Sequence, residues 1–192
     1  MPLILLNKPY QVLSQFRDAE GRRTLAEFVT EPGVYPAGRL DYDSEGLIAL
    51  TDDGRLQAAF SAPDGKLAKT YWAQVEGDPQ EEQLDELLRG VRLKDGSARA
   101  LTARVIDEPA GLWPRDPPIR YRKNVAEVWL EIRIATGRNR QVRRMTAAAG
   151  LPTLRLIRAA IGPWSIDALR PGESRRMEND AAWRDVNKHG QQ

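Results

Sequence analysis

Short apolar runs dominate the chain, and their alternating or unbroken hydrophobic positions predict strands. These runs are Leu3–Leu6, Val34–Leu40, Gly46–Thr51, Thr70–Val75, Val125–Ala135 and Leu154–Ile161, with a hairpin expected over Val91–Leu101 around Asp95-Gly96. Val125–Ala135 is the clearest run, because its apolar residues include a stretch of period two. Most runs are separated by turns rather than by helices, which indicates a mixed and largely antiparallel sheet.

Apolar residues at helical spacing, together with helix-ending residues, predict helices, which are fewer than the strands. The expected helices are Thr24–Val29, Arg55–Phe60, Pro79–Leu88 and Gln141–Ala149. Pro79–Leu88 has the strongest pattern, with leucines at helical spacing after an acidic first turn. The predicted fold class is therefore α+β, with helices flanking the sheet. From Glu178 onward the chain is polar, so we expect residues 178–192 to form a frayed C-terminal tail.

Composition narrows the kind of protein and the chemistry it can perform. Of the 192 residues, 41% are hydrophobic and 29% are charged, which supports a real core and excludes global disorder. No basic-then-apolar leader or membrane-length run is present, so we expect a cytoplasmic protein without membrane contact. The absence of cysteine and the single His189 exclude a disulfide frame, a cysteine-bound metal and a His-based triad.

Charge is distributed unevenly along the chain. Residues 1–100 carry 12 basic and 17 acidic side chains, whereas residues 101–192 carry 17 basic and 10 acidic ones. Between Arg115 and Arg158 there are 11 basic residues against three acidic ones, and every basic residue except Lys123 is an arginine. The planar fork of arginine suits phosphates and base edges. A solvated surface would not require arginine so consistently, so we predict a polyanionic partner on one face.

The segment Gly38–Leu47 places three carboxylates at alternate positions, namely Asp41, Asp43 and Glu45. A calcium loop beginning at Asp41 is improbable, because Glu45 and Asp52 are the wrong residue types at its fifth and twelfth positions and the flanks predict strands. A glycosidase-like carboxylate pair is a second interpretation, which nothing in the spacing fixes. From the residues alone, a polar turn is favoured.

Three further segments could contact a nucleic acid. Tyr71, in Lys69-Thr70-Tyr71, is either a half-buried sheet residue or a platform for a stacked base. Gly137–Met145 surrounds a helix start with four arginines, and this favours phosphate or carboxylate binding over a solvated basic face. Asp107–Lys123 is rich in proline and arginine and predicts a long loop, which is typical of functional or disordered segments.

Together these segments resemble the pseudouridine synthases of the bacterial small-subunit-rRNA-type family. The matching motifs are Gly38–Leu47 followed by Leu50–Gly54, Lys69-x-Tyr71, Gly137–Met145 and Leu156-x-Arg158-x-x-Ile161-Gly162, in that order, with Leu5–Pro9 similar to the start. The resemblance covers residues 3–177. It implies a pseudouridine synthase fold with a central RNA-binding cleft. Residues 1–177 would form one two-lobed catalytic domain without a separate N-terminal RNA-binding domain, and the reaction would need no metal and no cofactor.

The resemblance also implies roles for the matching residues. Asp41 is the expected catalytic carboxylate, and Arg143 is expected to pair with it. In the substrate site, Tyr71 would stack on the target uracil and Leu156 would pack under it, while Arg39 would hold the backbone or fill the space of the flipped nucleotide. The expected RNA-binding residues, which would grip phosphates, are Arg115, Arg120, Arg122, Lys123, Arg138 and Arg140.

Two features of the sequence resemble those of one subgroup of this family. That subgroup is implied to modify one uridine in the peptidyl-transferase region of 23S rRNA. The catalytic part begins at once, and Leu112–Arg120 forms a loop that is unusual for the family at large. The expected partner is therefore ribosomal RNA, specifically 23S rRNA, bound by a monomer. A non-catalytic ribosome-assembly factor is the main alternative, but it leaves Gly38–Leu47 without a task. A small-molecule glycosidase would leave the arginine-rich half unexplained.

Overall fold

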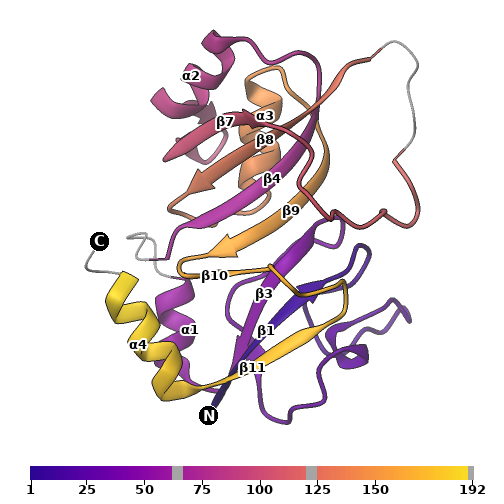
Figure 1. Cartoon of the computed structure of the whole chain (residues 1–192), viewed down its shortest axis with the longest axis vertical. Coiled ribbons are helices and arrows are strands. Elements are labelled where there is room, and N and C mark those ends of the chain that lie inside the picture. The colour runs from indigo at the N-terminus through magenta and orange to yellow at the C-terminus, as the bar shows by residue number, and fades with distance from the viewer. Residues whose placement is uncertain (62–66, 120–124, 190–192) are drawn as a thin grey trace.

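A nine-stranded mixed sheet runs through the molecule in the computed structural model, which describes residues 1–61, 67–119 and 125–189 (Figure 1). Its main path runs β11-β1-β3-β9-β4-β8-β7, with β2 beside β3 and β10 beside β9. The strands are β1 (Pro2–Lys8), β2 (Tyr35–Pro36), β3 (Glu45–Thr51), β4 (Lys69–Glu76), β7 (Thr102–Ile106), β8 (Glu127–Ile134), β9 (Thr153–Ile161), β10 (Trp164–Ser165) and β11 (Ser174–Glu178). β5 (Val91–Leu93) and β6 (Gly96–Ala98) form a separate hairpin. The α+β class with a largely antiparallel sheet is confirmed.

The sheet consists of two halves joined by very little backbone pairing. β11-β1-β3 and β9-β4-β8-β7 are each antiparallel, and they meet where β3 pairs with β9 in parallel over Glu45↔Ile157 and Gly46↔Arg158. Gly46 has φ +102°, and a Cβ added there would lie 2.4 Å from the backbone oxygen of Arg158. Only glycine permits this approach, so one residue without a side chain sets how closely the halves meet.

Strands β1 and β3 are buried on both faces, which explains why their residues form unbroken apolar runs. Alternate residues of each strand contribute to two different cores. Leu3 and Leu47 belong to the core that includes residues of α1 and α4, whereas Ile4 and Ile48 belong to the core that includes Tyr71 and the α3 side chains. The first half of the sheet is thus a shared wall between two hydrophobic layers.

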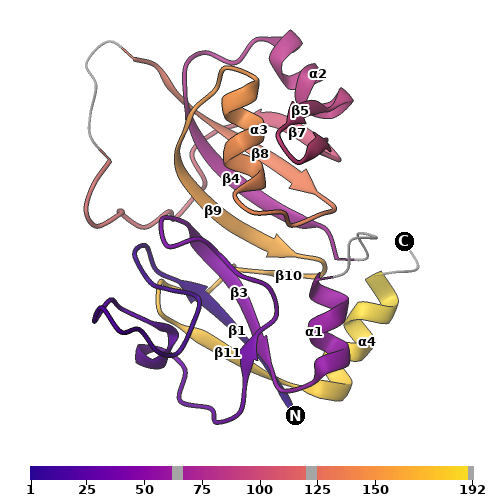
Figure 2. The same cartoon turned by 180° about the vertical axis from the view of Figure 1, so that it is seen from behind.

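The helices cover the two halves separately (Figures 1 and 2). α1 (Gly54–Ser61) contacts β3, and α4 (Asn179–His189) contacts β11 and β1. α2 (Glu81–Arg89) contacts β7, and α3 (Gln141–Ala148) contacts β5 and β9. A short 3₁₀ helix, η1 (Leu25–Glu27), lies in the connection between β1 and β2. Among residues 1–61, 67–119 and 125–189, no helix has the length and apolar character needed to cross a membrane.

The expected tail from Glu178 onward is wrong, because residues 179–189 form α4. This helix buries Ala182 and Val186, and the side chains of Asn179 and Trp183 both donate hydrogen bonds to Asp53 Oδ2, at 2.9 and 3.1 Å. Val34–Leu40 is also shorter as a strand than expected, since only β2 pairs with β3. β7 and β11 were not expected at all. Both lie at the ends of the main path and are largely exposed, and β11 carries the charged residues that edge strands commonly have.

Gly46→Ala should destabilise the protein more than another glycine substitution at positive φ. Gly33 has φ +79°, but nothing lies within 4 Å of a Cβ added to it. Gly33→Ala therefore carries backbone strain alone, about 1–3 kcal/mol. Gly46→Ala adds a clash with the backbone of Arg158, which no side-chain rotation relieves. Urea unfolding of both variants measures the difference, and equal losses would show that the β3–β9 approach is not rigid.

Candidate active site

A cavity of about 620 Å³ lies at the junction of the two halves. The loop before β3, the start of β4, the turn before α3 and the cavity-facing residues of β9 all line it. The residues expected at the site that line it are Arg39, Asp41, Tyr71, Arg138, Arg140 and Leu156. Arg143 and Arg115 lie outside this lining. Arg120, Arg122 and Lys123 lie outside the described residues.

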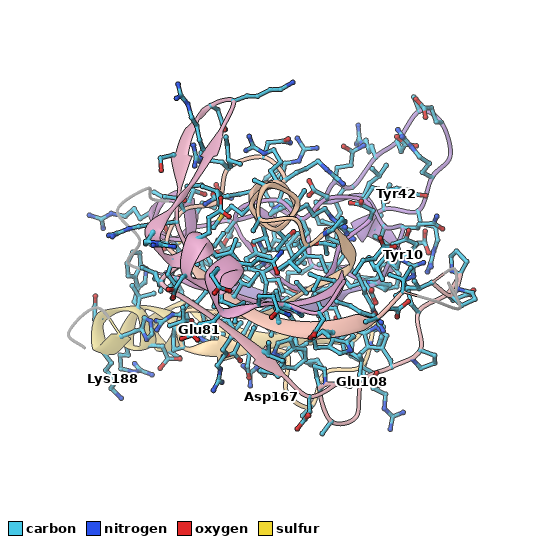
Figure 3. The ribbon with its side chains drawn as sticks, turned by 90° about the horizontal axis from the view of Figure 1, so that it is seen from above. Tyr10, Tyr42, Glu81, Glu108, Asp167 and Lys188 are labelled. Atoms are coloured by element: carbon cyan, nitrogen blue, oxygen red, sulfur yellow. The ribbon has the colours of Figure 1, made fainter. Side chains whose placement is uncertain are left out.

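Backbone hydrogen bonds from several directions fix the loop that carries Asp41. The Ser14 hydroxyl donates to the Leu40 carbonyl at 2.7 Å and accepts from the Leu40 N–H at 3.1 Å. The Gln11 N–H donates to the Tyr42 carbonyl at 2.9 Å, and Arg143 Nη2 donates to the Asp43 carbonyl at 2.7 Å. Tyr10 and Tyr42 accordingly lie on the same side of the molecule (Figure 3). The loop is held through its backbone, which leaves the Asp41 side chain available.

The three alternating carboxylates have three different environments. Asp41 lines the cavity, and its ion-pair partner among the described residues is Arg140, at 3.7 Å between Oδ2 and Nη1. Asp43 accepts two hydrogen bonds of 2.8 Å from Arg140. Burial raises the pKa of Asp43, but these hydrogen bonds and the nearby arginines outweigh it and hold the pKa below its usual range. Glu45 is buried and turned away, so the three side chains do not converge on one point.

Within ion-pair distance of Asp41, the described residues place Arg140 rather than Arg143, so the expected pair between Asp41 and Arg143 stays a prediction. Arg143 instead binds Asp43 and β9: its Nη2 donates to the Asp43 carbonyl, its Nη1 donates to the Thr153 carbonyl at 3.2 Å, and its Nε lies 3.6 Å from Asp43 Oδ2. Only 12% of the Arg143 side chain is exposed. Arg143 therefore contacts the backbone of the loop that carries Asp41 and fixes the segment that precedes β3.

Carboxylates of the protein itself compensate the arginines at the start of α3. Arg144 forms two hydrogen bonds with the Asp95 carboxylate, at 2.6 and 3.0 Å, and Arg138 donates to the backbone carbonyls of Asp95 and Ser97 at 3.0 and 2.7 Å. Together with the bonds from Arg140 to Asp43, these contacts show that the protein's own carboxylates pair with the arginines of this helix start. Phosphate binding by Arg138 and Arg140 stays a prediction, supported by the position of both residues in the cavity lining.

The buried end of the cavity has features suited to a base. Tyr71 on β4 is opposite Arg158 on β9 in the sheet register, and Leu156 precedes Arg158 by two residues. Because side chains alternate along strands, Leu156 and Arg158 face the same side. Tyr71 and Leu156 are 7% and 4% exposed. Lys69 and Arg158 also line the cavity, and neither was among the expected site residues, although both stand in motifs that carry the family resemblance.

On the opposite face of β9, Glu45 and Arg155 form a buried ion pair. Arg155 donates to both carboxylate oxygens of Glu45, at 2.8 and 2.9 Å, and the Trp113 indole N–H donates to Glu45 Oε1 at 2.7 Å. Arg155 also donates to the Trp113 carbonyl at 3.0 Å. The long loop after β7 is therefore tied to the junction of the halves, as its path in Figures 1 and 2 shows. No local sequence pattern indicates this cluster, because its members are far apart in the chain.

Two other basic residues of this region, Lys8 and Arg115, are held by burial and by stacking on an aromatic ring, respectively. Lys8 is fully buried and donates to the Pro9 and Val12 carbonyls at 2.9 and 2.8 Å. Burial lowers the pKa of Lys8 to about 7, although the nearby charge of Glu45 opposes this shift. Arg115 lies over the ring of Tyr10, with 4.4 Å between its Cζ and the ring centroid. The loop after β7 thus also touches the segment after β1.

The sequence matches the family described as RNA pseudouridylate synthase over residues 2–148. The chain therefore belongs to this family, and the class of enzyme implied by its motifs is confirmed. An isomerase of this class rearranges uridine within RNA without adding or removing atoms.

Named relatives and a solved structure agree with this assignment. Ribosomal large subunit pseudouridine synthase E of Xanthomonas axonopodis pv. citri (strain 306) is 61% identical over 171 residues, which are 88% of this chain and 90% of the relative. The enzyme of the same name from Vibrio parahaemolyticus serotype O3:K6 (strain RIMD 2210633) is 52% identical over 176 residues, which are 92% of this chain and 74% of the relative. A crystal structure described as that of a pseudouridylate synthase superposes with a TM-score of 0.74 at 25% identity, covering 98% of this chain and 74% of that one.

Breaking the Glu45–Arg155 pair should cost far more than breaking an exposed pair. Arg155→Met leaves a buried carboxylate without its cation, and we expect a loss of about 3–5 kcal/mol in the free energy of unfolding. Arg104→Met removes a partner of Glu131 from an exposed pair, in which the Arg104 side chain is 67% exposed, and should cost about 0–1 kcal/mol. Urea unfolding at neutral pH compares the two variants. Equal small losses would show that the buried pair does not hold the junction.

Proposed function

We propose that this enzyme isomerises a uridine of large-subunit ribosomal RNA to pseudouridine, with Asp41 as its catalytic carboxylate. The substrate assignment rests on the 61% and 52% identity to enzymes named for the large ribosomal subunit. Within that subunit, we propose a single uridine of 23S rRNA in the peptidyl-transferase region. The enzyme would act in the cytoplasm as a monomer, without a metal or a cofactor.

The environment of Asp41 is the observation that carries the catalytic assignment. Among the described residues, its side chain has no hydrogen bond, whereas Asp43 and Glu45 are each held by several. A carboxylate that is free of hydrogen bonds keeps its lone pairs available for the substrate. Arg140, the cation within ion-pair distance of it among the described residues, lies 3.7 Å away and forms no hydrogen bond with it. Asp41 is thus the one member of the motif that is both held in place and free to react.

The reaction needs only one such group. The bond between ribose C1′ and uracil N1 breaks, the base turns, and C1′ joins uracil C5 instead. The hydrogen on C5 leaves as a proton, and N1 takes up a proton, so the atoms balance without an added reactant. A carboxylate can act as the nucleophile or the base in this sequence. Asp41, at the open side of the cavity, would meet the ribose end of the nucleotide.

The remaining cavity residues would bind and orient the flipped nucleotide. An enzyme that reaches the glycosidic bond must take the uridine out of its stack. The Tyr71 ring offers a flat apolar surface for the uracil, and Leu156 packs beside it on the next strand. Arg39 would hold the backbone or fill the vacated space. Arg138 and Arg140 would contact the flanking phosphates, and Arg115 with Arg120, Arg122 and Lys123 would extend that contact along the RNA.

Asp41→Asn should abolish isomerisation and leave the fold intact. The amide keeps the shape of the side chain but cannot act as a nucleophile or a base. The assay is single-turnover conversion of uridine in a large-subunit rRNA fragment, and we expect a rate below about a thousandth of wild type. Asp52→Asn, at an exposed position just after β3, is the matched control and should retain the wild-type rate.

A second comparison separates chemistry from loop architecture. Asp43→Asn weakens the grip of Arg140 and Arg143 on the loop, so it should lower stability and slow the reaction only partly. If Asp41→Asn keeps a tenth of the wild-type rate, or if the Asp41 and Asp43 variants lose activity equally, Asp41 is not the catalytic group.

A further inference from the structure

Two buried cations lie side by side at the closed end of the cavity and have no assigned task. Lys69 is the first residue of β4 and precedes Tyr71 by two, so both side chains face the same side of the sheet. Arg158 is opposite Tyr71 on β9. Lys69 and Arg158 both line the cavity, and they are 7% and 5% exposed.

Their partners distinguish these cations from the buried or half-buried arginines that have a structural task, and from Lys8, whose ammonium donates to two backbone carbonyls. Arg158 donates from Nε to the Leu47 carbonyl at 2.7 Å and from Nη1 to the Arg39 carbonyl at 3.5 Å, while its Nη2 is buried without a partner. Among the described residues, the Lys69 ammonium has no hydrogen bond, and neither cation has a carboxylate within ion-pair distance. Arg140, Arg144 and Arg155 each have one.

Such an arrangement is costly for the free protein. A buried charge without a counter-charge destabilises a fold unless something else compensates it. Burial and the neighbouring charge of Arg158 lower the pKa of Lys69 to about 8. At neutral pH the ammonium form still predominates, because the pH lies below that pKa. The closed end of the cavity therefore presents uncompensated positive charge, which indicates a negative charge on the substrate.

The surroundings identify which part of the substrate carries that charge. Apolar and aromatic side chains line the same end of the cavity, among them Phe60, Ile134, Leu156 and Ile161. A phosphate would lose its hydration against these groups, whereas a uracil ring suits them. Arg138 is half-buried and Arg140 is exposed, and both stand at the opposite, open side and suit phosphates.

We propose that Lys69, with Arg158 beside it, stabilises the negative charge that the uracil acquires when its bond to the ribose breaks. This role rests on the proposed function. When the C1′–N1 bond breaks, its electron pair leaves with the base, and the charge spreads over N1 and the two carbonyl oxygens. Lys69 donates to a carbonyl oxygen of the ring that is stacked on Tyr71. Preorganised cations in a water-poor site lower the energy of a transition state in which such charge develops. Lys69 is in this account a catalytic residue.

Lys69→Met tests the proposal, because methionine keeps the length and flexibility of the side chain and removes its charge. The assay is single-turnover release of tritium from uracil C5 in a labelled large-subunit rRNA fragment, with the dissociation constant of the RNA measured on the same fragment. We expect the rate to fall ~100-fold or more and the dissociation constant to change little. Lys188→Met on α4 is the control, at an exposed position on the side of the molecule opposite Tyr42 (Figure 3), and should match wild type.

Two further readouts separate this role from a structural one. Lys69→Met should unfold at the same or a higher urea concentration than wild type, because it removes an uncompensated buried charge. A 5-fluorouridine substrate should reduce the rate defect, because fluorine withdraws electrons and makes the uracil a better leaving group. Rearrangement of this substrate is followed by nuclease digestion and chromatography, since no C5 hydrogen is present.

Several results would overturn the proposal. The first is an unchanged rate in Lys69→Met. The second is a defect confined to RNA affinity, which would make Lys69 a phosphate contact. The third is a rate defect of equal size for uridine and 5-fluorouridine. Failure of both Lys69→Met and Lys69→Gln to fold would also overturn it, since the charge would then serve the fold. If wild-type protein itself converts no uridine, the proposed function fails first. An active wild type with an equally active Lys69→Met removes only this inference.

Discussion

The close approach of β3 to β9 is the constraint on which the rest of the molecule depends. Two residue pairs of parallel backbone contact join a three-stranded half to a four-stranded half of the main sheet path, and Gly46 allows it because any Cβ would strike Arg158. The cavity opens on one face of this contact and the Glu45–Arg155 pair with Trp113 lies on the other. The geometry of the active site is therefore set by packing between the halves, not by the loop alone.

Charge is arranged with respect to this junction in two ways. Where arginines have a structural task, a carboxylate compensates them: Asp43 and Asp95 hold the start of α3, and Glu45 holds β9 to the loop after β7. At the closed end of the cavity the compensation stops. The Asp41 carboxylate accepts no hydrogen bond among the described residues, and Lys69 has no carboxylate partner there. A carboxylate whose side chain accepts no hydrogen bond at one end of a cavity, and uncompensated cations at the other end, are what a substrate needs if its ribose and its base develop charge in opposite senses.

Most of the architecture could be predicted from the sequence, because β1, β3, β4, β8 and β9 carry apolar patterns that depend on local residues alone. The predictions missed elements whose order comes from tertiary contact. β11 is a charged edge strand, and α4 buries few side chains and is anchored by hydrogen bonds to Asp53. Family motifs brought most of the expected residues to one cavity. They could not show that Arg140, rather than Arg143, lies within ion-pair distance of Asp41, since the two arginines are only three residues apart at the start of α3.

Pseudouridine mapping of 23S rRNA tests the central claim most directly. The RNA would come from cells lacking this protein and from the same cells supplied with either the wild-type gene or the Asp41→Asn gene. The account predicts that one pseudouridine of the peptidyl-transferase region disappears in the deletion strain, returns with wild type and stays absent with the Asp41 variant. An unchanged map in the deletion strain, or full restoration by Asp41→Asn, would contradict it.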